Sequence, residues 1–137
     1  MGKQVEFTAK LAAGIVSWEA DGNPAKDHKT KIDKGAKPEK IELRISSDDS
    51  ARGLKLQIDS SRPFQVWEDD RQCPPEGIRT DQIEVLSCDL DRMTIRDLNT
   101  GPERTLRYQL NVIDKDGNPH PCDPIILNGG AGPGNLT

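Results

Sequence analysis

Hydrophobic and polar residues alternate along much of the chain, most regularly between Thr105 and Asp114. A period of two is typical of a β-strand with one buried face. The buried face is predicted to carry Leu106, Tyr108, Leu110 and Val112, with polar residues between them. The turn-forming residues of 115–119 follow this stretch, and they predict where the strand ends.

The same alternation recurs in other segments, and none of them has the period of an amphipathic helix. The predicted strands are 5–11, 15–20, 41–45, 54–58, 64–67, 83–88, 93–98, 106–113 and 125–127. Turn signals come roughly every ten residues, which is typical of an all-β sandwich or barrel. Variable strand lengths and one long loop favour an immunoglobulin-like antiparallel β-sandwich of about eight strands. The cysteine and tryptophan pattern of immunoglobulin domains is absent, so this prediction concerns architecture only.

Three further expectations concern how the strands are connected. The turn at 99–103 predicts a hairpin between strands 93–98 and 106–113. The strand at 5–11 is terminal and is expected at a sheet edge, where it could pair with another chain. We expect one domain over 1–128, with a polar lysine-rich loop at 26–40 and a Gly-rich flexible tail at 129–137.

Composition narrows the classes of function. Hydrophobic residues make up 33% of the 137 residues and only five are aromatic, so the core is expected to be thin and aliphatic. A net charge of −4 argues against a nucleic-acid-binding protein. No apolar run reaches membrane-spanning length, and no signal peptide is apparent. Together with three widely spaced cysteines, at 73, 88 and 122, this predicts a cytoplasmic protein with reduced thiols. One disulfide with a free thiol is the alternative if the chain is exported.

Lysines are concentrated in the predicted loop at 26–40. This segment has six lysines and three carboxylates, a net charge of +3, which leaves −7 for the remainder of the chain. Such a separation can steer an acidic partner or a phosphate-bearing ligand, but a solvated loop is the favoured interpretation. No aromatic residue accompanies the lysines, so nucleic-acid bases would have nothing to stack on. The candidate partner-binding residues here are Lys26, Lys29, Lys31 and Lys34.

The segment 114–123 contains the second set of candidates, which are Asp114, Asp116, His120 and Cys122. The spacing of its first carboxylates matches the start of a calcium-binding EF-hand loop, but Pro119 stands where that loop needs glycine and Ile125 where it needs glutamate. A histidine, a thiol and a carboxylate close together could also bind zinc. A polar hairpin turn accounts for the same residues without a metal. Ligand or metal binding by this segment is therefore the alternative hypothesis.

The last predicted strand carries the motif Asp-Pro-Ile-Ile-Leu-Asn at 123–128. After a long alternating strand and a polar hairpin, it resembles the C-terminal end of small bacterial β-sandwich proteins, such as the DP-EP family and the inclusion-body protein family. The resemblance covers about thirty residues. It implies a small bacterial sandwich of undefined activity and transfers no catalytic residue.

Catalytic signatures are weak throughout the sequence. Adjacent carboxylates on a strand point to opposite faces, both histidines are in predicted loops, and no nucleophile elbow is present. The sequence therefore predicts a non-enzymatic binding or structural module that needs no metal or cofactor. Its partner is expected to be a protein or a second copy of itself, in a monomer or small homo-oligomer, with no nucleic acid or membrane involved.

Overall fold

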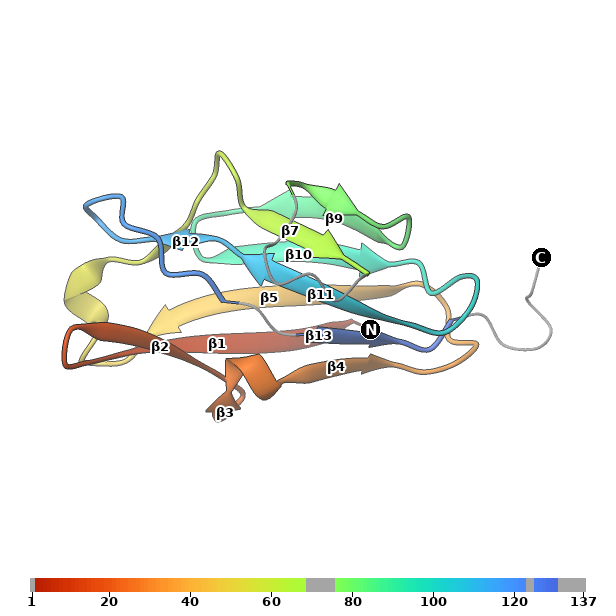
Figure 1. Ribbon diagram of the computed structural model, residues 1–137, viewed down its shortest axis with the longest axis horizontal. Helices are drawn as coiled ribbons and strands as arrows, with labels where there is room; N and C mark the ends of the chain where they lie inside the picture. The colour runs from red at the N-terminus through yellow and green to blue at the C-terminus, as the bar shows by residue number, and fades with distance from the viewer. Residues whose placement is uncertain (1, 69–75, 123–124, 131–137) are drawn as a thin grey trace.

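Two β-sheets lie face to face in the computed structural model, which describes residues 2–68, 76–122 and 125–130 (Figure 1). Strands make up 54% of the described residues and helices 5%, which confirms the predicted all-β class. Neither sheet closes on itself, so the architecture is a sandwich-like pair of layers and not a barrel.

The first sheet contains six strands: β1 Lys3–Ala12, β2 Ile15–Ala20, β3 Asn23–Pro24, β5 Glu39–Ser47, β9 Ile83–Cys88 and β10 Arg92–Asp97. Their order across the sheet is β3-β2-β1-β5-β10-β9. The second sheet contains β4 Lys29–Ile32, β7 Phe64–Trp67, β8 Ile78–Arg79, β11 Arg104–Leu110 and β13 Ile125–Asn128. Their order is β4-β13-β11-β7-β8. A small third sheet pairs β6 Gln57–Ile58 with β12 Val112–Ile113.

The core lies between the inner faces of the two large sheets, where alternate residues of each strand are buried. The first sheet contributes Val5, Phe7, Ile41, Leu43, Met93 and Ile95, and the second contributes Leu106, Tyr108, Leu110, Val66 and Ile126. Burial of a large aliphatic side chain stabilises a fold by about 1.5–3 kcal/mol, and this layer therefore holds the sheets together. The predicted inner face of the 105–114 segment is confirmed.

The strand count and the purely antiparallel pairing were predicted wrongly. The described part of the chain forms 13 strands, four of them only two residues long, and such short strands have no detectable alternation. Both large sheets are mixed, because β1 pairs with β5, β13 with β4, and β7 with β8 in parallel. The predicted strand at 54–58 is shorter than expected: its first residue ends the 3-10 turn η2 Arg52–Leu54, 55–56 are irregular, and only Gln57–Ile58 form a strand, β6.

The hairpin predicted across 99–103 does not form. β10 pairs with β5 and β9 in the first sheet, whereas β11 pairs with β7 and β13 in the second, so the turn crosses between layers. Asn99 explains the crossover, because it is buried with a left-handed φ of 55°. Its side-chain amide donates to the backbone oxygens of Asp33 and Ala36, which ties the turn to the segment after β4.

The strand predicted at an edge is internal, since β1 lies between β2 and β5. The predicted lysine-rich loop is also partly regular, because it contains the 3-10 turn η1 Ala25–Asp27 and the strand β4. Thr30 and Ile32 of β4 point inward and are buried. With only two buried residues, the alternation in this segment was too short to predict a strand from the sequence.

The predicted tail at 129–137 begins with two packed glycines, and its residues from 131 onward lie outside the described residues. Gly130 is buried, donates its N–H to the side chain of Asn99 and accepts from the N–H of Gly35. A Cβ at Gly129 would lie 2.5 Å from the Ile32 oxygen, so only glycine fits there. These contacts fix the end of β13 against the end of β4.

The described helices are the two three-residue turns η1 and η2, neither of which could cross a membrane.

Candidate functional site

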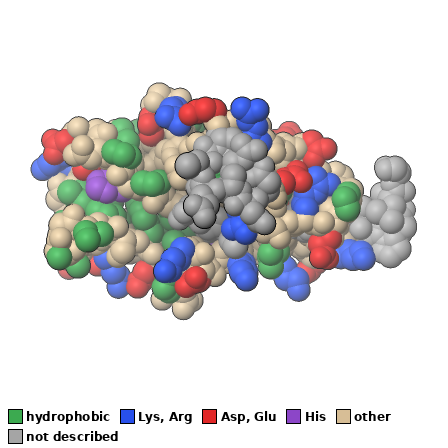
Figure 2. Space-filling model, in the orientation of Figure 1, with side chains coloured by type: hydrophobic (Ala, Val, Ile, Leu, Met, Phe, Trp, Pro, Cys, Tyr) green, Lys and Arg blue, Asp and Glu red, His purple; other side chains and the backbone are tan. Residues whose placement is uncertain are grey.

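Strand β4, which carries the candidates Lys29 and Lys31, lies on one side of the sandwich, at the lower border of Figure 1. β4 is the edge strand of its sheet, with β13 on one side and no strand of the described chain on the other. Because side chains alternate along a strand, Lys29 and Lys31 point outward while Thr30 and Ile32 point into the core. Blue side chains are frequent along the same border of the space-filling view, with red ones between them (Figure 2).

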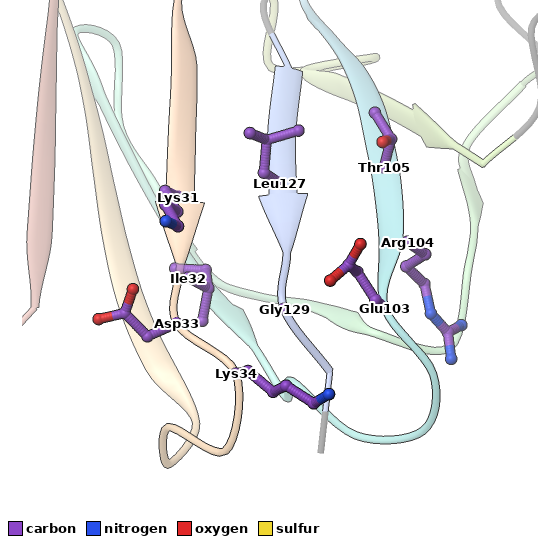
Figure 3. Close-up of a pocket in the computed structure, with 9 residues that line it drawn as sticks. All are labelled: Lys31, Ile32, Asp33, Lys34, Glu103, Arg104, Thr105, Leu127 and Gly129. Atoms are coloured by element: carbon purple, nitrogen blue, oxygen red, sulfur yellow. The ribbon is translucent and has the colours of Figure 1, made fainter. Parts of the chain in front are cut away.

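A hollow of about 530 Å³ lies on the outer face of the second sheet, beside β4. Lys31 of β4, Leu127 of β13 and Thr105 of β11 follow one another across it, as the strand register requires (Figure 3). Lys34 and Glu103 border the end of the hollow. Its volume is within the range of small-molecule sites, but it is open and carries both charge signs, which suits part of a larger surface better.

The lysines of this edge have no internal counterions. Among the described residues, Lys29, Lys31 and Lys34 form no ion pair. By contrast, Nζ of Lys10 on β1 lies 3.2 Å from Oε1 of Glu19. Exposed lysines without a fixed partner attract negatively charged molecules at long range, and this attraction weakens with salt. The edge is therefore a free positive surface on a chain of negative net charge.

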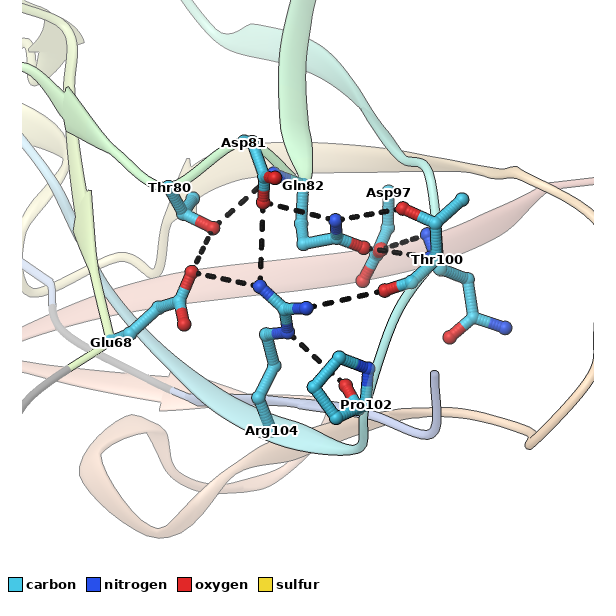
Figure 4. Close-up of polar contacts among 9 residues, drawn as sticks. Glu68, Thr80, Asp81, Gln82, Asp97, Thr100, Pro102 and Arg104 are labelled. Atoms are coloured by element: carbon cyan, nitrogen blue, oxygen red, sulfur yellow. Dashed lines mark hydrogen bonds and ion pairs between the residues drawn. The ribbon is translucent and has the colours of Figure 1, made fainter. Parts of the chain in front are cut away.

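Arg104 also lines the hollow, but its guanidinium is held by other groups (Figure 4). Its Nη1 lies 3.2 Å from Glu68 Oε2 and 3.3 Å from Asp81 Oδ1. Its Nε and Nη2 donate to the backbone oxygens of Pro102 and Thr100. Hydrogen bonding from Gln82, together with the charge of Arg104, lowers the pKa of Asp81. Arg104 thus stabilises the connection before β11 and contributes little free charge to the hollow.

Asp97 lies at the inner end of the same network and is fully buried. Burial raises its pKa to about 6, although the N–H of Asn99, which donates to Asp97 Oδ1 at 2.8 Å, and the charge of Arg104 both oppose this. Since Asn99 anchors the segment after β4, Asp97 supports the geometry of the lysine edge from within the core.

Lys26 lies apart from the other three lysines. It is in η1 and borders a separate hollow with Trp18 and Cys122. The Trp18 indole N–H donates to the backbone oxygen of His120 at 3.0 Å, which ties β2 to the 114–123 segment. The structure therefore brings Lys29, Lys31 and Lys34 to one surface and leaves Lys26 outside it.

The 114–123 segment is a closed hairpin-like turn. Asp114 Oδ1 accepts the N–H groups of Asp116 and Asn118, and Asp114 Oδ2 lies 2.9 Å from Nε2 of His120. The His120 contact, helped by the backbone donors, lowers the pKa of Asp114 to about 2. These contacts match the turn interpretation, because the carboxylate that would bind calcium is already used to fix the backbone.

The segment also does not assemble a metal site from the described residues. Cys122 is buried in the core, and its backbone bridges Leu110 through two hydrogen bonds. Among the described residues, no three His, Cys, Asp or Glu side chains come together as metal ligands. Cys73 and Asp123, which the zinc hypothesis also involved, lie outside the described residues.

Comparisons with known proteins assign the chain to no family. No family model matches it, and no curated protein matches it significantly.

Sequence reasoning missed the groups that shape the lysine edge. Thr105 and Leu127 were recognisable as outward positions by alternation, but their alignment with Lys31 depends on long-range pairing of β4, β13 and β11. Nothing local marks Arg104 or Glu103 as neighbours of the lysines.

Proposed function

We propose that this protein is a non-enzymatic binding module that takes up an acidic protein partner along the lysine edge formed by β4. The observation that carries the proposal is the edge itself: an unpaired strand side with outward lysines that have no internal counterions among the described residues. An acidic partner would gain charge attraction from the lysines and contact area from the adjacent hollow.

A protein partner fits the surface better than a nucleic acid or a phosphate. The hollow contains Glu103 and Asp33 as well as lysines, and this mixture of charges matches a polypeptide with charged and neutral side chains better than a continuous run of phosphates. An unpaired strand edge offers backbone donors and acceptors, and these recognise another polypeptide. The outward side chains of the edge then select for carboxylates.

Binding of a synthetic peptide tests this proposal. The probe is a fluorescent peptide of alternating Glu and Val residues, measured by anisotropy at low and at physiological salt. The Lys29→Glu, Lys31→Glu double variant should bind at least tenfold more weakly. The matched control is Lys55→Glu with Lys115→Glu, two exposed lysines outside the edge. Equal loss in the control, or no binding to the unaltered protein, would overturn the proposal.

Three finer predictions remain proposals beside it: an immunoglobulin-like relationship of the sandwich, a bacterial source, and a cytoplasmic location. The two-layer arrangement supports the first, and the resemblance of 123–128 supports the second. Cys122 is buried as a small core side chain and Cys88 is exposed, which supports a reducing compartment.

A further inference from the structure

A slot between the two sheets lies on the inner side of the lysine edge. It has a volume of about 310 Å³ and is bordered by Lys3, Gln4 and Val5 of β1 and by Lys29, Thr30 and Lys31 of β4. His28 and Asp21 border it as well, with His28 Nε2 3.3 Å from Asp21 Oδ2. The slot is therefore distinct from the hollow on the outer face and shares Lys31 with it.

On the β4 side, the slot is lined by unpaired strand backbone. The Ile32 oxygen accepts from the N–H of Gly129 at 2.9 Å, so the backbone groups of Ile32 point toward β13. Backbone direction alternates along a strand, which turns the N–H and C=O groups of Lys29 and Lys31 to the open side.

On the β1 side, the first residues are also open. β2 pairs only with residues from Phe7 onward, so 3–5 have β5 on one side and no strand of the described chain on the other. On this open side of β1, the backbone groups of Glu6 bond to Asp21. The Glu6 oxygen accepts from the N–H of Asp21 at 3.0 Å, and the Glu6 N–H donates to Asp21 Oδ1 at 3.2 Å. By alternation, the N–H and C=O groups of Gln4 face the slot.

Two buried polar atoms border the slot without hydrogen-bond partners among the described residues. They are Oγ1 of Thr30, a residue only 5% exposed, and Nδ1 of His28. Buried polar groups are nearly always paired in stable structures, because an unpaired one costs free energy. Their position marks the slot as a place where further polar groups would stabilise the fold.

We infer that an acidic, extended segment of the partner inserts into this slot as a strand and bonds to β4 and β1 at once, which would join the two sheets along this side. Residues of β1 and β4 border the same slot, and both strands have open backbone groups there, so one extended segment in the slot reaches both. Lys3 and the outward Lys29 and Lys31 select carboxylates on the inserted segment. This inference rests on the proposed function and specifies how the partner binds.

Alternate N-methylation of the Glu-Val peptide tests the insertion. A strand between two edges uses both alternate sets of its N–H groups, whereas a strand added to β4 alone uses one set. Two peptides, each methylated on one set, should therefore both bind at least tenfold more weakly than the parent. Full affinity of either methylated peptide would overturn insertion and leave edge binding intact, whereas failure of the parent peptide would overturn both proposals.

Amide hydrogen exchange of the full chain gives a second readout. Saturation with the parent peptide should slow exchange at least tenfold at Gln4, Lys29 and Lys31. The amides of Val5 and Ile32, which face β5 and β13, serve as internal controls and should change little. Protection of Lys29 and Lys31 without protection of Gln4 would show that the segment binds β4 only.

Discussion

The two open sides of the sandwich differ in the side chains that they expose. On one side, β4 directs lysines outward and buries its apolar residue, Ile32. On the other side, β9 exposes Val85 and Leu86, and Leu90 follows in the next turn at 60% exposure (Figure 1). Lysines on an edge strand discourage indiscriminate pairing, whereas exposed apolar residues do not. If the proposed function holds, charge would select the partner at the lysine edge, whereas self-association would use the β9 edge.

β9 has one feature that limits such pairing. Its register with β10 shifts between Thr94 and Ile95, which leaves Leu86 as an extra residue in a bulge. Bulges twist an edge and interrupt the regular ladder that a second strand would need. The expected monomer or small homo-oligomer would therefore associate through β9, in place of β1, and only weakly.

The largest expected contrast between the two sides is in stability. Ile32 is 1% exposed, so Ile32→Ala should lower the free energy of unfolding by about 3 kcal/mol through lost burial and a cavity. Val85 is 40% exposed, and Val85→Ala should cost less than about 1 kcal/mol. Urea denaturation of both variants measures this difference. Similar losses would mean that β4 is not anchored through its inner face.

The second largest effect should be the pH dependence of stability that Asp97 causes. Its pKa is raised from 3.8 to about 6, so the folded state binds more protons than the unfolded state between these values. Stability should therefore fall by roughly 1–2 kcal/mol as pH rises from about 4 to 6. Asp97→Asn keeps the acceptor for Asn99 and should remove this component of the pH dependence. Thermal melts across this range provide the measurement, and an unchanged pH profile in the variant would contradict the assignment.

The contact between Asp114 and His120 should give a pH dependence of stability opposite to that of Asp97. Because the pKa of Asp114 is lowered to about 2, its stabilising contribution is complete above pH 4 and is lost as pH falls toward 2. His120→Ala should raise the pKa of Asp114 and shift this loss to higher pH. Carboxyl chemical shifts followed by NMR titration report it directly. An unmoved Asp114 titration would show that the backbone donors alone set its pKa.

Lysine substitution on β9 should affect stability least and association most. Val85→Lys with Leu86→Lys should change the free energy of unfolding by under about 1 kcal/mol, since both side chains are already exposed. Any concentration-dependent rise in mass by light scattering should disappear. Ile15→Lys, at an exposed apolar residue away from β9, is the control. Retained association in the double variant would move the interface away from this edge.

The alternation of residues in the sequence predicted which side of each strand is buried, but it did not predict which strands pair. The inner faces of 5–11, 41–45 and 106–110 were readable, because alternation is a local property of residues on a half-buried strand. The partners of those strands were not readable, as the absent hairpin at 99–103 shows. Sheet membership there depends on Asn99, whose contacts lie more than sixty residues away in the chain.

The lysines of the candidate site were also predicted from the sequence, but their strand and the slot beside it were not. Lys29, Lys31 and Lys34 were named from their charge, and the structure places them on one surface. Their strand was missed because Thr30 and Ile32 are its only core contacts. The slot was unpredictable, since it requires that β1 extend beyond β2 and that β4 lie opposite.

The position of β13 has a consequence for how the chain folds. Among the described strands, β4 pairs only with β13, which is separated from it by more than ninety residues. Contacts at such sequence separation form late, because a long loop must close before they are made. During synthesis, residues 29–32 therefore emerge long before the strand that docks them. The lysine edge is completed only after residues 125–128 have joined the sheet, so the proposed partner would bind only the finished fold.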